Sequence, residues 1–417
     1  MSEPTVSPLP FPSPAARDVL TQILHDKAGQ LLAQAVEAEA DQWLADHAAV
    51  VDEQGHRQVV RNGHLPTRRV LTGIGAVEVT QPRLRDKRAV ALREKFTSKV
   101  LPPYLRKAQS IEELIPWLYL KGISTGDMGR ALEPLVGPQA QGLSASVVTR
   151  LIHQWQEDFR QWRQRSLADR RYVYLWADGI HFNIRLEDEG NDRQCILVLI
   201  GATAEGKKEL IAASDGYRES EQSWSELLLE AKSRGLTVPP KLAVGDGAMG
   251  FWAALRKVLP TCRQQRCWVH KTANVLTQMP RHLHAKATSM LHDIWMAEKR
   301  ADAIRAFDLF LESFRAKYPA AVECLEKDRD VLLTFYDFPA EHWVHLRTTN
   351  PIESTFATVR LRHDKTKGNG SRMACLTMVF KLIESAAHGW RLLNGSEILP
   401  EVLAGVAFED GVKNAAA

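Results

Sequence analysis

The spacing of apolar residues divides the chain into a mainly helical N-terminal part, a central part with strand patterns, and a helical part after it. Residues 16–48 carry apolar positions at helical spacing, which predicts one or two helices. "VLTGIGAVEV", residues 70–79, alternates around glycines and predicts a short β-hairpin. Residues 110–163 return to helical spacing, with short helices separated by glycine-containing turns. They predict a helix-turn-helix whose last helix, residues 146–163, enters the major groove of DNA, although a plain helical bundle gives the same pattern.

Strand patterns begin at residue 171. The runs "RYVYLWA", "IHFNIRLE" and "RQCILVLIGAT" predict three strands in a meander, and a helix over 220–235, a strand over 241–245 and a further helix follow. This order describes an α/β layer with a mixed sheet. Residues 275–345 are helical in pattern throughout, and "TTNPIESTFATVRLRHDK" predicts a capped helix.

Charge is distributed unevenly along the chain. The net charge is +4, yet residues 57–107 hold thirteen Lys and Arg residues against three acidic ones, so the rest of the chain is negative. This asymmetry indicates a polyanionic partner, most simply nucleic acid. The five cysteines include no CxxC pair, and neither a signal peptide nor a membrane-spanning run is evident. We therefore expect a soluble protein of the cytoplasm.

Three acidic residues carry the candidate chemistry, and each also has an ordinary structural explanation. Asp178 begins an Asp-Gly link between two alternating runs, which is typical of a hairpin turn. Asp246 lies in a Gly-Asp-Gly stretch just after a buried-looking strand, which is again common in turns. Glu353 is the third residue of a helix for which Asn350 is the predicted N-cap and Pro351 the first helical residue.

These explanations do not account for the three acids as a set. One is expected at the end of the first strand, one after the last strand and one on a late helix of the same α/β unit, and sites in open sheets gather at strand ends. Carboxylates placed there suit hard divalent cations, and two ions can activate an attacking oxygen and stabilise a leaving one in phosphoryl transfer. The predicted helix of Glu353 supports this placement, since one face carries the apolar residues Ile352, Phe356 and Val359 and another carries Glu353, Ala357, Arg360 and Asp364.

Several ordered motifs resemble the Mutator-like bacterial insertion-sequence transposases of the DDE class. They are "ADGIHF" at Asp178, "GYRESEQSWSELLLEAKSRGL" in the connecting helix, "VGDGAMGFWAAL" at Asp246, "CWVHKTANVL" after it, and "TTNPIESTFATVRLR" at Glu353. "RNGHLPTRRVLTGIGAVEVTQPRLRD" resembles the N-terminal region of the family, so the resemblance covers roughly residues 55–390. One departure is Asp364, an acid in a segment that family members usually keep basic.

The resemblance implies a fold and a set of site residues. The fold class is α/β, an RNase H-like catalytic core with a mixed sheet, interrupted by an all-helical insertion and preceded by a mainly helical DNA-binding region with a helix-turn-helix. Asp178, Asp246 and Glu353 match the metal-binding triad, with two Mg²⁺ or Mn²⁺ ions expected. Cys267 and His270 match a C-x-x-H signature outside that triad, and we expect buried packing or contact near the DNA for them. Trp343 resembles an insertion-domain tryptophan close to the DNA end, and the alternative for it is a core residue.

The expected activity is that of a DNA transposase, which binds the terminal inverted repeats of its insertion sequence and then cleaves and joins DNA strands. The expected partners are double-stranded DNA of those repeats and of the target, and a second copy of the chain on DNA, in the bacterial nucleoid and away from membranes. A non-catalytic repressor or domesticated transposase is the alternative, and a nuclease that hydrolyses without joining is another.

The expected domains are residues 1–54 (N-terminal helical segment), 55–165 (DNA binding), 166–274 and 346–395 (the two parts of the catalytic domain), 275–345 (insertion) and 396–417 (tail). The predicted DNA contacts are Arg61, Arg68, Arg69, Arg83, Arg85, Lys87, Arg88, Trp343, Arg360, Arg362, Lys365 and Lys367.

Overall fold

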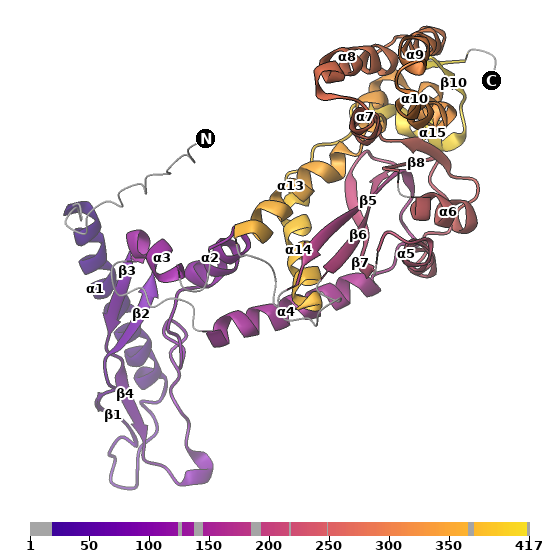
Figure 1. Cartoon of the computed structure of the whole chain (residues 1–417). Helices are drawn as coiled ribbons and strands as arrows, with labels where there is room; N and C mark the ends of the chain where they lie inside the picture. The colour runs from indigo at the N-terminus through magenta and orange to yellow at the C-terminus, as the bar shows by residue number, and fades with distance from the viewer. Residues whose placement is uncertain are drawn as a thin grey trace, which may run out of the picture. The chain divides into compact units, whose positions relative to one another are not determined.

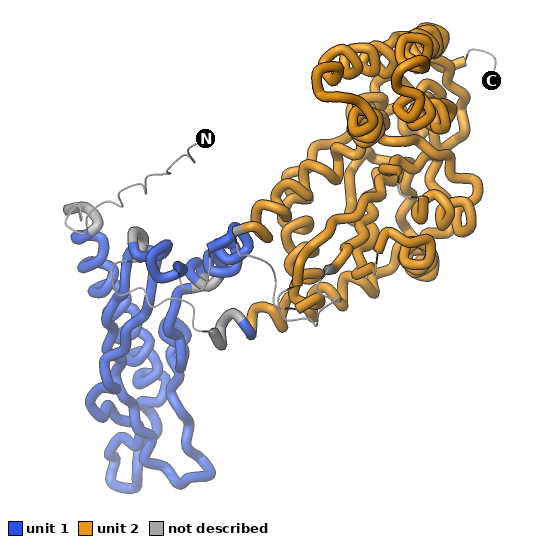
Figure 2. Tube along the Cα trace, in the orientation of Figure 1, with its two compact units in different colours: residues 1–149 blue, residues 150–417 orange. Residues whose placement is uncertain are grey.

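The chain forms two compact units, residues 1–149 and 150–417, coloured separately in Figure 2. The computed structural model describes residues 19–123, 127–136, 145–184, 193–216, 218–247, 249–365 and 371–414. Each unit is described below by itself. The boundary crosses the helix that the sequence analysis assigned to DNA binding, α4 (Ala145–Gln164).

The first unit is built around a long helix and a β-hairpin. The helix α1 (Val19–Asp46) is continuous, and the predicted hairpin is confirmed as β2 (Arg68–Thr72) and β3 (Gly75–Val79), which pair antiparallel. Because side chains alternate along a strand, Val70, Val77 and Val79 all face Val36 of α1 and form a small core with Leu101. The hydrophobic alternation seen in the sequence is thus the buried face of the hairpin.

A second strand pair in this unit was not predicted. β1 (Val59–His64) and β4 (Pro82–Asp86) pair antiparallel, with an irregularity between Arg61 and His64. Their sequences are mostly polar and carry little hydrophobic alternation, so sequence patterning could not reveal them. The unit also contains the short 3-10 helix η1 (Val90–Leu92) and the helices α2 (Gln109–Leu120) and α3 (Met128–Val136).

The second unit contains a five-stranded mixed sheet in the order β7-β6-β5-β8-β9. Figure 1 labels its strands β5, β6, β7 and β8. β5 pairs antiparallel with β6 and β6 with β7, whereas β5, β8 and β9 run parallel. The mixed α/β architecture is therefore confirmed. The predicted strand division is wrong, because "RYVYLWA" and "IHFN" form one strand instead of two, and the third strand of the meander comes after "RQCILVLIGAT". The strands are β5 (Tyr172–Asn183), β6 (Arg193–Thr203), β7 (Lys208–Gly216), β8 (Leu242–Gly245) and β9 (Arg263–Arg266).

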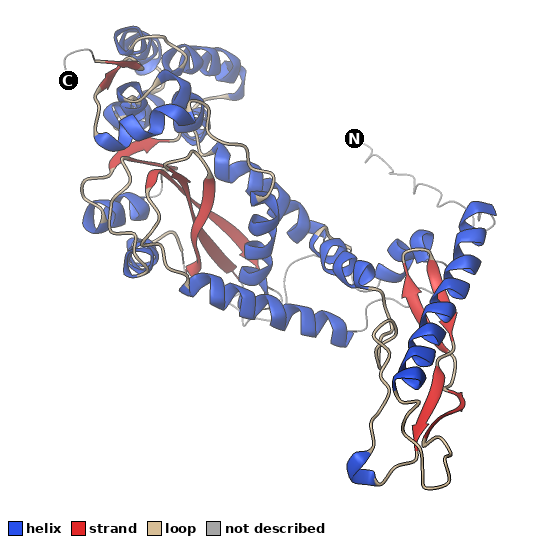
Figure 3. Cartoon of the chain, turned by 180° about the vertical axis from the view of Figure 1, so that it is seen from behind, coloured by secondary structure: helices blue, strands red, loops and turns tan. Residues whose placement is uncertain are grey.

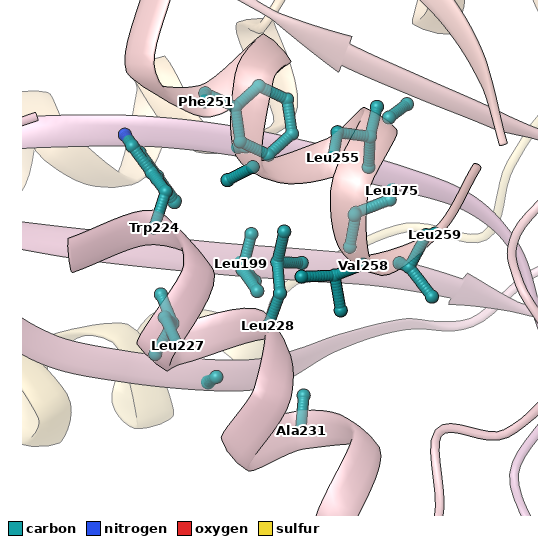
Figure 4. Packing of buried hydrophobic residues seen from close by; sticks show 14 of the residues in the cluster. Leu175, Leu199, Trp224, Leu227, Leu228, Ala231, Phe251, Leu255, Val258 and Leu259 are labelled. Atoms are coloured by element: carbon teal, nitrogen blue, oxygen red, sulfur yellow. The ribbon is translucent and has the colours of Figure 1, made fainter. Parts of the chain in front are cut away.

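One face of this sheet is covered by α5 (Glu221–Ser233) and α6 (Met249–Val258). Figure 4 shows Trp224, Leu227 and Leu228 of α5 meeting Phe251 and Leu255 of α6 over the strands. Ser220 caps α5, since its hydroxyl accepts a hydrogen bond from the Ser223 amide at 3.1 Å. This core fixes the ends of β5 and β8 relative to each other.

The opposite face packs against α13 (Asn350–Lys365) and α14 (Arg372–Ala387), and helices lie on both sides of the sheet in Figure 3. The C-terminal half of α4 joins this layer: Phe159 and Trp162 pack on Phe380 of α14, and Asp158 pairs with Lys381 at 2.7 Å. That half of α4 is therefore occupied by contacts within the second unit.

Residues 275–345 contain only helices and connecting loops, as predicted. The short C-terminal hairpin, β10 (Phe408–Glu409) and β11 (Val412–Lys413), fastens this stretch, since the Gly411 amide donates to Tyr336 O at 3.2 Å and Gly411 O accepts from Ala340 N at 3.1 Å. The tail thus has a structural role that its sequence did not indicate. The remaining helices of the unit are α7 (Trp268–Thr277), η2 (Arg281–Leu283), α8 (His284–Trp295), α9 (Arg300–Arg315), α10 (Pro319–Glu326), α11 (Arg329–Leu332), η3 (Thr334–Asp337), η4 (Ala340–His342), α12 (Trp343–Leu346), η5 (Ser396–Ile398) and α15 (Leu399–Ala404).

Candidate active site

Asp178 lies in the middle of the central strand β5, opposite Val198 of β6. The hairpin-turn interpretation is therefore wrong, and so is the expectation that Asp178 ends the first strand. The strand continues through Asp178 and Gly179 because both are paired with β6. The residue is only 5% exposed, so its carboxylate is held at the sheet with little water around it.

Asp246 follows β8 directly, as predicted. Because Ala177 of β5 is the parallel partner of Gly245, the next residues on the two strands, Asp178 and Asp246, are neighbours. The backbone of Asp246 is fixed from α6, since Trp252 Nε1 donates to Asp246 O at 3.0 Å. Two carboxylates that are far apart in the sequence thus come from adjacent strands.

Glu353 is in the first turn of α13. Ile352, Phe356 and Val359 are fully buried, which confirms the predicted apolar face, and the side chain of Glu353 is half-buried. The helix begins at Asn350, one residue earlier than predicted, and the Glu353 amide donates to Thr349 O at 3.0 Å. Asn350 is thus the first helical residue of α13.

His270, for which we expected buried packing or contact near the DNA, lies beside Glu353. Its Nε2 lies 3.1 Å from Glu353 Oε1, and one ligand atom from each of Asp178, His270 and Glu353 lies within 4.8 Å of the others. Asp246 is adjacent through the strand pairing but is not one of these three. The C-x-x-H spacing was a signal for His270, but only the through-space contact between α7 and α13 assigns it to the site.

Cys267 joins the elements that carry these side chains. Its amide donates to Gly245 O at 2.8 Å, beside Asp246, and its Sγ accepts from the Thr349 amide at 3.3 Å, at the start of the Glu353 helix. It also precedes α7, which carries His270. This fully buried cysteine therefore aligns three segments of the site, in agreement with the buried packing that we expected for it.

The charges of the cluster are strongly coupled. Burial raises the pKa of Asp178 to about 7, the positive charge of His270 opposes this, and the charges of Asp246 and Glu353 add to it. Hydrogen bonds to Cys267 and Glu353 raise the pKa of His270 to about 11, and the bond from His270 lowers the pKa of Glu353. A bound cation would stabilise these desolvated carboxylates, because it would offset their mutual repulsion.

The predicted DNA contacts of the first unit differ in their surroundings. Arg61 pairs with Glu37 and Asp41, Arg69 with Glu78, and Arg88 with Asp86 and Glu94, while Arg68 donates to Leu101 O and Pro102 O. The remaining predicted contacts of this unit are Arg83 and Arg85 on β4 and Lys87 just after it. All three are exposed, and no ion pair is found for them among the described residues.

The predicted DNA contacts of the second unit also differ in their exposure. Trp343 is 6% exposed, donates from Nε1 to Phe338 O at 2.8 Å and packs edge-on against Phe335 and Tyr336, so its surroundings are those of the core residue that we gave as the alternative. Arg362 is 3% exposed, which leaves little of its guanidinium to solvent, whereas Arg360 is exposed and lies 3.7 Å from Glu353. Lys365 ends α13, and Lys367 lies outside the described residues.

Sequence comparison places the chain in a family. Residues 13–392 match the family described as "Transposase, Mutator family". The chain belongs to the Mutator family of transposases. It is 52% identical, over 301 residues, to the transposase for insertion sequence element IS6120 of Mycolicibacterium smegmatis, a match that covers 72% of this chain and 92% of that protein.

Other insertion-sequence transposases are similar along much of their length. The transposase for IST2 of Acidithiobacillus ferrooxidans is 49% identical over 292 residues, covering 68% of this chain and 95% of that protein. The transposase for ISRM5 of Rhizobium meliloti is 26% identical over 388 residues, covering 92% and 93%. These relatives support a role in transposition of a mobile element. Within the described residues, this transposase has no helix long and apolar enough to cross a bilayer.

Proposed function

We propose that this transposase binds the terminal inverted repeats of its own insertion sequence and cleaves and joins DNA strands with Asp178, Asp246 and Glu353 as the catalytic acids. The observation that carries this proposal is the meeting of Asp178, Glu353 and His270 within 4.8 Å, with Asp246 on the neighbouring parallel strand. The five-stranded mixed sheet with helices on both faces supports our assignment of an RNase H-like core. The helical stretch 275–345 supports the assignment of an insertion.

The donor set fits Mg²⁺ or Mn²⁺, which prefer carboxylate oxygens and keep several water ligands. We assign Asp178, Asp246 and Glu353 to hold two such ions. When bound, two divalent ions activate an attacking oxygen and stabilise the charge on the leaving oxygen.

The protein's own groups hold this centre in place. The contacts of His270 with Cys267 and Glu353 raise its pKa and so favour the protonated form, and its Nε2 lies 3.1 Å from Glu353 Oε1, so we assign it to orient that carboxylate. Asp178 donates nothing when ionised, and its Oδ1 accepts the Gly179 amide at 2.9 Å, which fixes its rotamer on the strand. A rigid strand and two helix starts thus present the carboxylates in a set geometry.

The proposed chemistry has two steps. Water attacks a phosphodiester at the element end and frees a 3′-hydroxyl, and that hydroxyl then attacks a second strand. Each step exchanges one P–O bond for another, so no external energy source is needed. We propose residues 55–165, with a helix-turn-helix, as the region that binds the repeats, and a homodimer that holds two ends together.

Replacement of Asp178 by Asn tests the proposal. We expect loss of Mg²⁺-dependent nicking and joining of repeat-end DNA with retained binding in a mobility-shift assay, because residues 55–149, most of the proposed DNA-binding region, are in the other unit. Undiminished strand transfer by this variant would remove Asp178 from the triad. A wild-type protein that binds the repeats but neither nicks nor joins them would favour the non-catalytic alternative, and nicking without joining would favour the nuclease.

A further inference from the structure

A second cluster of potential ligands lies on the other face of β5. His181 of β5 is the direct cross-strand partner of Cys195 on β6, and both belong to the face that packs toward α5 and α6. Glu219, just before α5, completes the group, with its Oε1 3.3 Å from His181 Nε2. One ligand atom from each of the three residues lies within 4.8 Å of the others.

Two glycines hold Glu219 in this place. A Cβ on Gly179 would lie 2.7 Å from Oε1 and Cδ of Glu219, and a Cβ on Gly250 would lie 2.3 Å from its backbone oxygen. Both positions therefore have to lack a side chain for the segment to fit between β5 and α6. Oε2 of Glu219 is buried and has no hydrogen-bond partner among the described residues, so one oxygen of a carboxylate in the cluster is desolvated and left unsatisfied.

We propose that His181, Cys195 and Glu219 form a second metal site, which binds one Zn²⁺ ion. An imidazole, a thiolate and a carboxylate together are a donor set that suits Zn²⁺, unlike the three carboxylates around Asp178, which suit Mg²⁺. The proposal does not depend on the catalytic assignment, because it uses none of the proposed catalytic residues.

The side chains have to move by about 1 Å to hold the ion. Zinc–ligand bonds of about 2.0–2.3 Å in a tetrahedral arrangement place two ligand atoms about 3.3–3.6 Å apart, whereas the three ligand atoms here lie within 4.8 Å of one another. The side chain of His181 is 63% exposed and can rotate to do this. The same exposure leaves the fourth zinc position to water.

Binding of Zn²⁺ at this site releases one proton, that of the Cys195 thiol. Burial, with the charge of Glu219 adding to it, raises the pKa of Cys195 to about 12, so without metal the group is a thiol. Zinc binding breaks the S–H bond, forms a Zn–S bond and releases the proton to solvent, with no change of oxidation state.

The test uses metal-free full-length protein. Titration with Zn²⁺ is followed by competition with a chromophoric chelator, and titration with Co²⁺ is followed by its thiolate-to-cobalt charge-transfer absorption. We expect wild-type protein to bind one equivalent of Zn²⁺ that depends on Cys195, in addition to any ion at the Asp178 site, and to show that absorption. Cys195→Ser should abolish the absorption and weaken Zn²⁺ binding at least about 10-fold, the lower limit seen when even an outer partner of a ligand is lost.

Three further variants complete the experiment. Cys262→Ser is the matched control, a buried cysteine outside the cluster, and it should keep both signals. His181→Gln changes an exposed side chain, so it tests the site without disturbing the fold, and it should weaken Zn²⁺ binding. Asp178→Asn should leave both signals intact. No stoichiometric Zn²⁺ binding by wild-type protein, or an unchanged cobalt absorption in Cys195→Ser, would overturn the proposal, whatever the outcome of the strand-transfer assays.

Discussion

Replacing Arg83, Arg85 and Lys87 together with glutamine should reduce the salt dependence of DNA binding. These three cations are exposed, and no ion pair is found for them within the described part of the chain, so they are available to neutralise phosphates. Arg61, by contrast, is paired with Glu37 and Asp41 on α1.

The size of the effect follows from counterion release. Each phosphate neutralised on duplex DNA contributes about 0.9 to the slope of log K against log salt, so three contacts contribute about 2.7. Between 50 and 200 mM salt this slope corresponds to a change in affinity of about 40-fold. We therefore expect the triple variant to lose about 2.7 from the slope, measured by fluorescence anisotropy with one duplex at several salt concentrations.

Arg61→Gln is the control, and it should change the slope by much less than 0.9 because its guanidinium is held by two carboxylates. Circular dichroism verifies that both variants keep the fold. An unchanged slope in the triple variant, or a loss of about 0.9 in Arg61→Gln, would refute the division of the basic segment into paired and available cations.

Three further predictions concern buried and coupled charges. Lys271 is fully buried and pairs with Asp328, so Lys271→Met should lower the free energy of unfolding by about 3 kcal/mol in a urea titration, and a change below about 1 kcal/mol would contradict this. Hydrogen bonds from Arg88 hold the pKa of Asp86 well below its usual 3.8. The ionised carboxylate therefore stabilises the fold fully above pH about 4, and this stabilisation is lost as the pH falls through the lowered pKa. In Asp86→Asn the free energy of unfolding should fall less steeply with decreasing pH, and a pH profile identical to that of the wild type would argue against this. His270→Gln should weaken Mn²⁺ binding about 10–100-fold in a calorimetric titration while DNA binding is retained, and unaltered Mn²⁺ affinity would exclude an orienting role.

The amphipathic elements of this transposase could be predicted from the sequence. The β2–β3 hairpin and the apolar face of α13 follow from alternation and helical spacing, because each buries one face. β9, the segment Arg263–Arg266, could not be predicted, because it is an edge strand with only polar residues and forms by pairing with β8. β1 and β4 were not predicted either, because their sequences are mostly polar and the two strands form by pairing with each other.

The candidate site was predictable in part. Asp246 and Glu353 lie at element ends, where the sequence placed them, but an Asp-Gly pair between alternating runs is compatible with a turn and with a continuous strand. Only pairing with β6 and β8 decides in favour of the strand for Asp178. His270 reaches Glu353 across 83 positions of the chain, through contacts that Cys267 and Thr349 make, and local patterning carries no information about such contacts.

The most direct measurement of the central claim is metal rescue of Asp178→Cys. A thiolate binds Mg²⁺ poorly and accepts softer ions, so the ion requirement of cleavage should change if this side chain is a ligand. We predict that Asp178→Cys does not cleave repeat-end DNA in Mg²⁺ and recovers cleavage in Mn²⁺, whereas Asp178→Ser recovers in neither. Full cleavage by Asp178→Cys in Mg²⁺, or equal recovery of both variants in Mn²⁺, would contradict a metal-binding role for Asp178.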